Sequence, residues 1–226
     1  MENIRSPEDI LASLQSGNLK SGIFLVTGER GAGKTTWLNK LVSVASDASF
    51  QVKGLLSPGS FENGVKVAIN LIALGSGEKR IMSTPVPQQL NAGKGKLRRL
   101  DTGELVLGGW QMHEDVLTWG NDLLYQLLTT PQPADNRVRS LLIIDELGPL
   151  EFNHGLGFTN AIKFGDFLNP NRLSSTQAKQ DDNTHPDPVH LLPYHASFIV
   201  IRPDLLPRAL ANWPQAQILE INPSTR

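Results

Sequence analysis

The stretch Gly22-Ile23-Phe24-Leu25-Val26-Thr27-Gly28-Glu29-Arg30-Gly31-Ala32-Gly33-Lys34-Thr35-Thr36 decides the fold of this 226-residue chain. Residues 28–35 fill every fixed position of the phosphate-loop pattern G-x-x-x-x-G-K-[ST]. The residues before the loop form an apolar run of strand length. Apolar side chains after it recur at helical spacing, at Trp37, Leu38, Leu41 and Val42. Strand, glycine loop and helix therefore follow one another in the order that predicts an α/β sheet with a phosphate site at its edge.

The loop residues are expected to bind a nucleoside triphosphate. Glycines let backbone N–H groups converge on the phosphates, and the following helix directs its positive end at the same anion. Lys34 is expected to reach the β and γ phosphates, and the Thr35 hydroxyl to ligate magnesium. Thr36 either joins the site or only continues the helix, and Arg30 points to phosphate or, as we favour, to solvent. The expected nucleotide-binding residues are Gly28, Glu29, Arg30, Gly31, Ala32, Gly33, Lys34, Thr35 and Thr36.

A second motif lies about a hundred residues downstream. Leu141-Leu142-Ile143-Ile144 is an unbroken aliphatic run, typical of a strand buried on both faces of a parallel sheet, and Asp145-Glu146 follows it. In loop-type nucleotide hydrolases an acid at a strand end holds magnesium opposite the loop threonine, and Asp145 has that place. Glu146 is the candidate for the base that takes a proton from the attacking water. The alternative is a solvated acid pair at the end of a strand.

Composition bounds the other function classes. The chain has 39% hydrophobic residues, a formal net charge of −1 and no cysteine. Disulfides and thiolate metal sites are excluded, so Mg²⁺ held by oxygen ligands is the expected cofactor. We expect no membrane span, no signal peptide and no general attraction to nucleic acid, which favours a cytoplasmic protein. The length favours a single domain over residues 1–226.

Strand and helix signals alternate along the rest of the chain. The glycines of Gly75-Ser76-Gly77 predict a hairpin turn inserted beside a parallel sheet, and the polar segment 169–189 is expected to be a mobile loop. Strands are expected at 22–27, 51–56, 65–74, 78–86, 103–113, 141–144, 196–201 and 216–221, and helices between Ser6 and Gly17, after the loop, and at 116–128, 158–168 and 204–212.

The two motifs together resemble a known family. Residues 28–36 with Ile144-Asp145-Glu146-Leu147-Gly148-Pro149-Leu150-Glu151 are similar to the small P-loop nucleoside-triphosphatases of the cancer-related type, whose second motif runs Asp-Glu-Ile-Gly-Pro-Met-Glu. Lys53-Gly54-Leu55-Leu56-Ser57-Pro58 resembles that family's second strand. Residues 64–78 resemble its hairpin, which ends in a Thr-Gly-Glu turn. The resemblance covers most of the chain in order.

This resemblance implies a fold and an activity. The fold is a RecA-like or kinase-like three-layer α/β sandwich with a mainly parallel sheet and an inserted or appended β-hairpin. The activity is slow, Mg²⁺-dependent hydrolysis of the γ phosphate of several nucleoside triphosphates, with broad base tolerance. Lys34 and Glu146 carry over as catalytic residues, and Thr35 and Asp145 as metal ligands. The chain departs from the family at Ser60-Phe61-Glu62-Asn63, where an acid and an arginine are usual, and in the segment 169–189.

Three weaker candidates have more than one interpretation each. Glu151 either orients the metal shell or, as we favour, caps the helix after Pro149. Arg202 either senses the γ phosphate or is a surface cation. The basic run Lys94-Gly95-Lys96-Leu97-Arg98-Arg99 forms a lid, binds nucleic acid or, as we favour, is a solvated face. The five histidines show no metal-ligand spacing.

Two rival functions keep the same nucleotide site. A kinase would pass the phosphoryl group to a second small substrate and would need an acceptor pocket and an arginine lid. A nucleotide-switched binding module would use hydrolysis as a timer and recruit a macromolecular partner through the segment 169–189 or the basic run, and the residues do not indicate which protein partner that would be.

Overall fold

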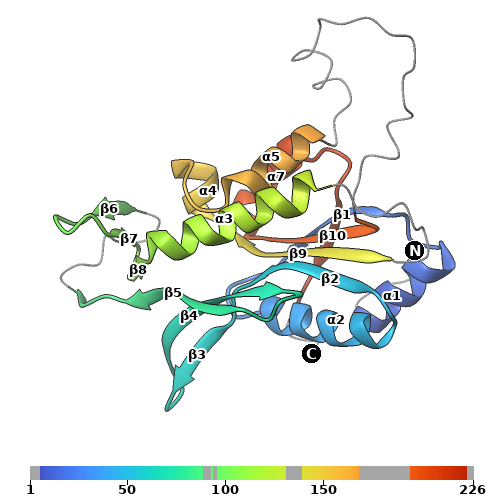
Figure 1. Cartoon of the computed structure of the whole chain (residues 1–226), viewed down its shortest axis with the longest axis horizontal. Helices are drawn as coiled ribbons and strands as arrows, with labels where there is room; N and C mark the ends of the chain where they lie inside the picture. Colours follow the sequence, from blue (N-terminus) through green and yellow to red (C-terminus); the bar gives the residue numbers. More distant parts are fainter. Residues whose placement is uncertain (1–5, 89–92, 94–95, 131–138, 168–193, 223–226) are drawn as a thin grey trace, which may run out of the picture.

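The computed structural model describes residues 6–88, 93, 96–130, 139–167 and 194–222 (Figure 1). The predicted mobile loop at 169–189 lies outside these ranges. The helices are α1 (Pro7–Ser16), α2 (Lys34–Asp47), α3 (Glu114–Thr129), α4 (Pro149–His154), α5 (Thr159–Phe167) and α7 (Leu206–Asn212), with the 3-10 turn η3 (Pro203–Leu205). The strands are β1 (Gly22–Thr27), β2 (Gln51–Leu56), β3 (Gly59–Glu62), β4 (Val65–Leu74), β5 (Lys79–Pro85), β6 (Leu97–Arg99), β7 (Leu105–Leu107), β8 (Trp110–Met112), β9 (Ser140–Leu147), β10 (Ala196–Ile201) and β11 (Gln217–Glu220).

Within these ranges the strands form one mixed sheet in the order β11-β1-β10-β9-β2-β4-β5-β8-β7-β6, with β3 paired to β4. The strands from β11 to β2 are parallel to one another. From β4 onward every neighbouring pair is antiparallel. The predicted α/β fold with a parallel core and an added hairpin is confirmed. The antiparallel part is larger than one hairpin, because β6, β7 and β8 extend the sheet beyond β5.

Helices cover both faces of the parallel core, so the fold has three layers (Figure 1). The cluster on one face contains side chains of α1 and α2, and the cluster on the other contains side chains of α3, α4, α5 and α7. Alternate residues of β10 belong to opposite clusters: Phe198 and Val200 to the first, Ile199 and Ile201 to the second. A strand buried on both faces needs a continuous apolar sequence, which explains the unbroken runs in β9 and β10.

The structure corrects two predictions about strands. The single strand expected at 103–113 is two short strands, β7 and β8, which turn at Gly108-Gly109 and pair with each other. No strand was predicted between 56 and 65, but β3 begins at Gly59, two residues after Ser57. Asn63-Gly64 was the missed signal: both residues have positive φ and form a two-residue hairpin turn between Glu62 and Val65.

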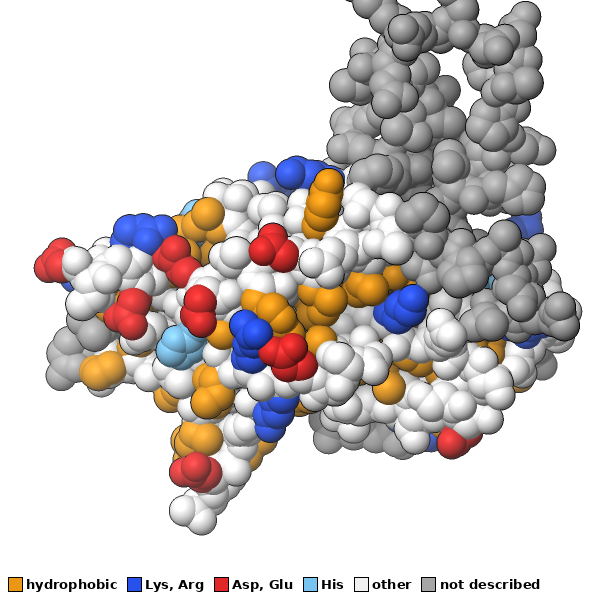
Figure 2. All heavy atoms as spheres, in the orientation of Figure 1, with side chains coloured by type: hydrophobic (Ala, Val, Ile, Leu, Met, Phe, Trp, Pro, Cys, Tyr) orange, Lys and Arg blue, Asp and Glu red, His pale blue; other side chains and the backbone are white. Residues whose placement is uncertain are grey.

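The β3–β4 hairpin projects from the sheet and carries exposed hydrophobic side chains, among them Phe61 and Val65 (Figures 1 and 2). The first helix begins as predicted: the Ser6 hydroxyl accepts the backbone N–H of Asp9 at 3.1 Å, and α1 ends at Gly17 in the left-handed conformation. None of the helices in the described ranges is long and apolar enough to cross a bilayer.

Candidate functional site

The phosphate loop connects β1 to α2 at the edge where the parallel strands end. Gly28, Gly31 and Gly33 all have positive φ, at 148°, 82° and 96°. Space also requires glycine at position 28, since a Cβ there would lie 2.2 Å from the carbonyl oxygen of Ile221. Ile221 directly follows β11 and is tied to the end of β1, because its N–H donates to Thr27 O at 2.8 Å. The loop is therefore pressed against the chain end of β11.

Lys34 is the first residue of α2 and is almost completely buried. Its Nζ donates to the carbonyl oxygens of Gly28 at 2.6 Å and of Glu29 at 3.0 Å. The ammonium group thus lies inside the curve of the loop. Arg30 and Thr36 are exposed, which agrees with the solvent-facing alternative for Arg30.

Asp145, on β9, lies beside the loop although it is 110 residues from Thr35 in sequence. The Thr35 hydroxyl is 3.4 Å from Asp145 Oδ1, and the Ser57 N–H donates to Oδ2 at 3.2 Å. The Ser57 hydroxyl also donates to the Asp145 carbonyl oxygen. The two segments singled out in the sequence, the loop and the acid pair, therefore meet at one place.

Burial dominates the electrostatics of Asp145, which is 2% exposed. Burial raises the pKa of its carboxyl from 3.8 to about 6, the charge of Glu146 adds to the rise, and the bonds from Ser57 and Thr35 and the charge of Lys34 oppose it. A buried carboxylate next to a threonine hydroxyl offers the hard oxygen donors that Mg²⁺ prefers. The residues present therefore fit this metal.

An irregularity in β9 separates the two acids. Ile199 of β10 pairs with Ile144, but Ile201 pairs with Leu147, so β9 has one extra residue over this stretch. Asp145 bonds with Ser57, which follows β2, and with Thr35 of α2. Glu146 bonds instead across to the end of β10. At this bulge, Asp145 contacts the β2 side of β9 and the adjacent Glu146 contacts the β10 side.

Glu146 is paired with Arg202, the residue directly after β10. Arg202 Nε donates to Glu146 Oε1 at 2.6 Å. The Glu146 side chain is 32% exposed and that of Arg202 is 51% exposed. The carboxylate of Glu146 is therefore accessible, in contrast with that of Asp145.

Glu151, on α4, has the contacts of a cap. Its carboxylate accepts the N–H of Gly148, which precedes α4, at 2.8 Å and the N–H of Phe158 at 3.0 Å. Burial raises its pKa to about 7 against these bonds, and the charge of Glu146 adds to the rise. This geometry favours the structural interpretation of Glu151, because both oxygens are used to join the two ends of the α4 segment.

The basic run does not join the site in the part that the structure describes. Residues 97–99 form β6, the last strand of the antiparallel extension, and Arg99 is paired with Glu114 at 2.7 Å. Lys94 and Gly95 lie outside the described residues. The structure thus gives no support to an arginine lid formed by Arg98 and Arg99.

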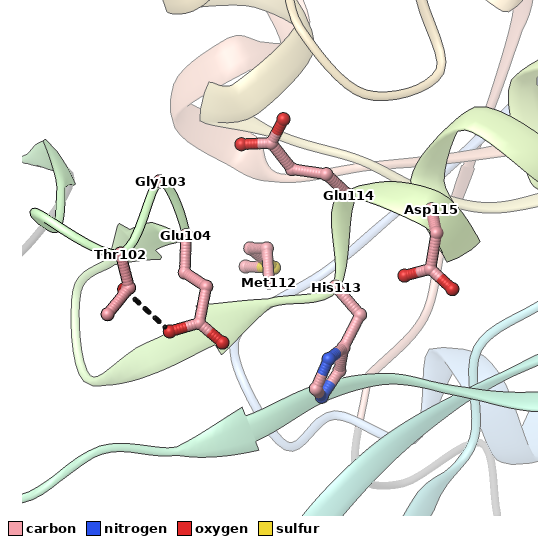
Figure 3. Close-up of a pocket in the computed structure, with 7 residues that line it drawn as sticks. All are labelled: Thr102, Gly103, Glu104, Met112, His113, Glu114 and Asp115. Atoms are coloured by element: carbon pink, nitrogen blue, oxygen red, sulfur yellow. Dashed lines mark hydrogen bonds between the residues drawn. The ribbon is translucent and has the colours of Figure 1, made fainter.

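A cavity of about 340 Å³ lies between β7, β8 and the start of α3 (Figure 3). Two of its acids are already bonded: Glu104 accepts from Thr102 and Gln111, and Glu114 from Arg99. Its lining residues are Thr102, Gly103, Glu104, Met112, His113, Glu114 and Asp115. None of them belongs to the loop or to β9, so this cavity is separate from the phosphate site.

Ser57 was missed as a site residue in the sequence, where it was named only within the stretch that resembles the family's second strand. Two facts identify it: β2 is the parallel neighbour of β9, and Ser57 is the first residue after β2. Carboxyl ends of neighbouring parallel strands lie at the same edge of a sheet, so a polar residue there is a candidate partner for the acid.

Comparison with known proteins found a family, a relative and a solved structure that are similar to this chain. Residues 23–105 match the model of a family described as NTPase. The chain is 28% identical over 133 residues to the nucleoside-triphosphatase THEP1 of Caldivirga maquilingensis, a match that covers 59% of this chain and 62% of that relative. The solution structure of a human cancer-related nucleoside triphosphatase has the same fold, with a TM-score of 0.51, 15% identity and 88% of each chain covered. With its complete phosphate loop and this fold, the chain is thus similar to the NTPase family of P-loop proteins, through a match that spans residues 23–105.

Proposed function

We propose that this protein hydrolyses the γ phosphate of nucleoside triphosphates in a reaction that requires Mg²⁺, with broad tolerance of the base. The observation that carries the proposal is the distance of 3.4 Å between Thr35 Oγ1 and Asp145 Oδ1, because it joins the phosphate loop to the acid pair. The relative from Caldivirga maquilingensis, named as a nucleoside-triphosphatase, supports the same activity class. A cytoplasmic location remains our expectation.

The residues have distinct roles in this proposal. Lys34 and the loop N–H groups neutralise the β and γ phosphates, as Lys34 already lies inside the loop. Thr35 and Asp145 would hold Mg²⁺, which when bound offsets phosphate charge. Glu146 accepts a proton from the water whose oxygen attacks the γ phosphorus, while the bond from that phosphorus to the bridging oxygen breaks. The products are a nucleoside diphosphate and inorganic phosphate.

Phosphate release from ATP, GTP, CTP and UTP, measured with Mg²⁺ and with EDTA, tests the activity. Replacing Glu146 by glutamine keeps the shape but removes the base, so we expect kcat to fall by about 10²-fold or more while nucleotide binding remains. Glu62→Gln is the matched control, since Glu62 is exposed on the β3–β4 hairpin. No release above the EDTA value from any of the four nucleotides would reject the proposal.

The same assay separates the two rival functions. A kinase would release little phosphate with water alone and would consume ATP when a small-molecule acceptor is added. A nucleotide switch would bind triphosphate tightly and turn over negligibly without a partner. The ion pair of Arg99 with Glu114 favours hydrolysis over the kinase, because it engages one of the two arginines proposed for a lid.

A further inference from the structure

Arg202 stands next to the proposed base because of the way β9 and β10 pair. The two strands are parallel neighbours, and the bulge in β9 sets Ile201 opposite Leu147. Arg202 and Glu146 therefore leave the sheet at the same edge, where Nε donates to Oε1 at 2.6 Å. Sequence alone left Arg202 open between a phosphate sensor and a surface cation, and neither interpretation included a bond to Glu146.

The charges around Glu146 explain why it needs a cation. Two buried carboxyls, those of Asp145 and Glu151, lie close enough that the charge of Glu146 acts on both. The buried loop cation, Lys34, instead donates to the carbonyl oxygens of Gly28 and Glu29. Among the described residues, Arg202 is the cation that forms an ion pair with Glu146. Without Arg202, the Glu146 carboxylate would lose the ion pair that holds its orientation.

We propose that Arg202 is a positioning residue that holds the Glu146 carboxylate in the orientation from which it takes the proton of the attacking water. A general base must lie within about 2.6–3.2 Å of that water, so loss of orientation lowers the rate even when the base is intact. The bond engages Oε1, and we assign the proton to Oε2. Arg202 thus acts on the chemical step through Glu146 and not through the nucleotide. This inference rests on the proposed function.

Substitution of Arg202 by alanine tests the inference. We expect kcat to fall by about 10- to 100-fold while KM changes by less than about threefold, because orientation of the base and not nucleotide binding is lost. Binding of a fluorescent triphosphate analogue should be unchanged. Arg202→Lys should recover part of the rate, and guanidinium ion at millimolar concentration should partly restore R202A without accelerating the unmodified protein.

Two controls separate positioning from a structural effect. Arg208, on α7, donates to the Phe152 carbonyl oxygen at 3.0 Å and so joins α7 to α4 without touching Glu146. Arg208→Ala should keep kcat close to that of the unmodified protein. In the Glu146→Gln background, R202A should lower kcat no further, because the group that it positions is already absent.

Four results would overturn the inference while leaving hydrolysis intact: an unchanged kcat in R202A, an increased kcat, a raised KM at constant kcat, or the same fold loss in the Glu146→Gln background. A raised KM would make Arg202 a phosphate-binding residue instead. If R202A does not fold, the same criteria apply to Arg202→Lys. Absence of Mg²⁺-dependent phosphate release from the unmodified protein would reject the proposed function itself, so the two failures are distinguishable.

Discussion

Asp145→Asn should make the metal-free protein more stable, and increasingly so as the pH rises. The folded protein raises the pKa of this carboxyl from 3.8 to about 6, chiefly through burial. Between these values the folded state binds more protons than the unfolded state, so the free energy of unfolding falls as the pH rises. At 1.36 kcal/mol per pKa unit, the raised pKa of Asp145 lowers the free energy of unfolding by about 3 kcal/mol at pH 8 and by under about 1 kcal/mol at pH 4. Asparagine removes this cost and still offers an oxygen to the Ser57 N–H.

Urea unfolding in EDTA without nucleotide, between pH 4 and pH 8, measures the effect. The gain of about 3 kcal/mol at pH 8 corresponds to a rise in Tm of roughly 6–12 °C for a chain of this size. Asp101→Asn is the matched control, because Asp101 is exposed. Glu151, whose pKa is also raised, is present in both proteins and cancels in their difference.

Two stability curves that stay parallel across this pH range would refute the reasoning, as would a D145N protein that is less stable at pH 8. The same variant should lose Mg²⁺-dependent nucleotide binding, because Asp145 is the proposed metal ligand. The variant would then be more stable but unable to bind Mg²⁺ with nucleotide. This trade-off is expected where a buried carboxylate destabilises the fold but is needed to bind a metal ion.

Two further predictions concern the loop and the core. Gly28→Ala should abolish nucleotide binding, because the new Cβ would lie 2.2 Å from the backbone oxygen of Ile221 at a φ of +148°; titration with a fluorescent triphosphate analogue checks this, and affinity equal to that of the unmodified protein would contradict it. Phe198→Ala should lower the free energy of unfolding by about 3–5 kcal/mol, because Phe198 is fully buried and stacks on Phe24 at a centroid distance of 5.0 Å; a loss under about 1 kcal/mol in urea unfolding would show that the core closes over the gap.

Local pattern was sufficient for much of the fold and for both motifs. The loop at 28–35 needs glycine conformations and a helix start that neighbouring residues specify, and β10 was predicted with the bounds Ala196–Ile201 because both of its faces are buried. Two hairpin turns, at Gly108-Gly109 and at Asn63-Gly64, have residues typical of two-residue turns, but they were not predicted from the sequence. The assigned roles of Lys34, Thr35, Asp145 and Glu146 remain proposals, although the structure brings the loop and the acid at position 145 together.

The amino-acid sequence was sufficient to predict a phosphate loop and a buried strand that ends in two acids. Both depend on local properties, which are backbone conformation and the periodicity of apolar residues. The contacts of those acids depend on which strands are neighbours and on their register. The adjacency of β2 and β9 brings Ser57 to Asp145, and the adjacency of β9 and β10 brings Arg202 to Glu146. These contacts join residues that lie 56 to 110 positions apart in the sequence. They are decided only by the tertiary structure, because the order and register of the strands in the packed sheet bring the residues together.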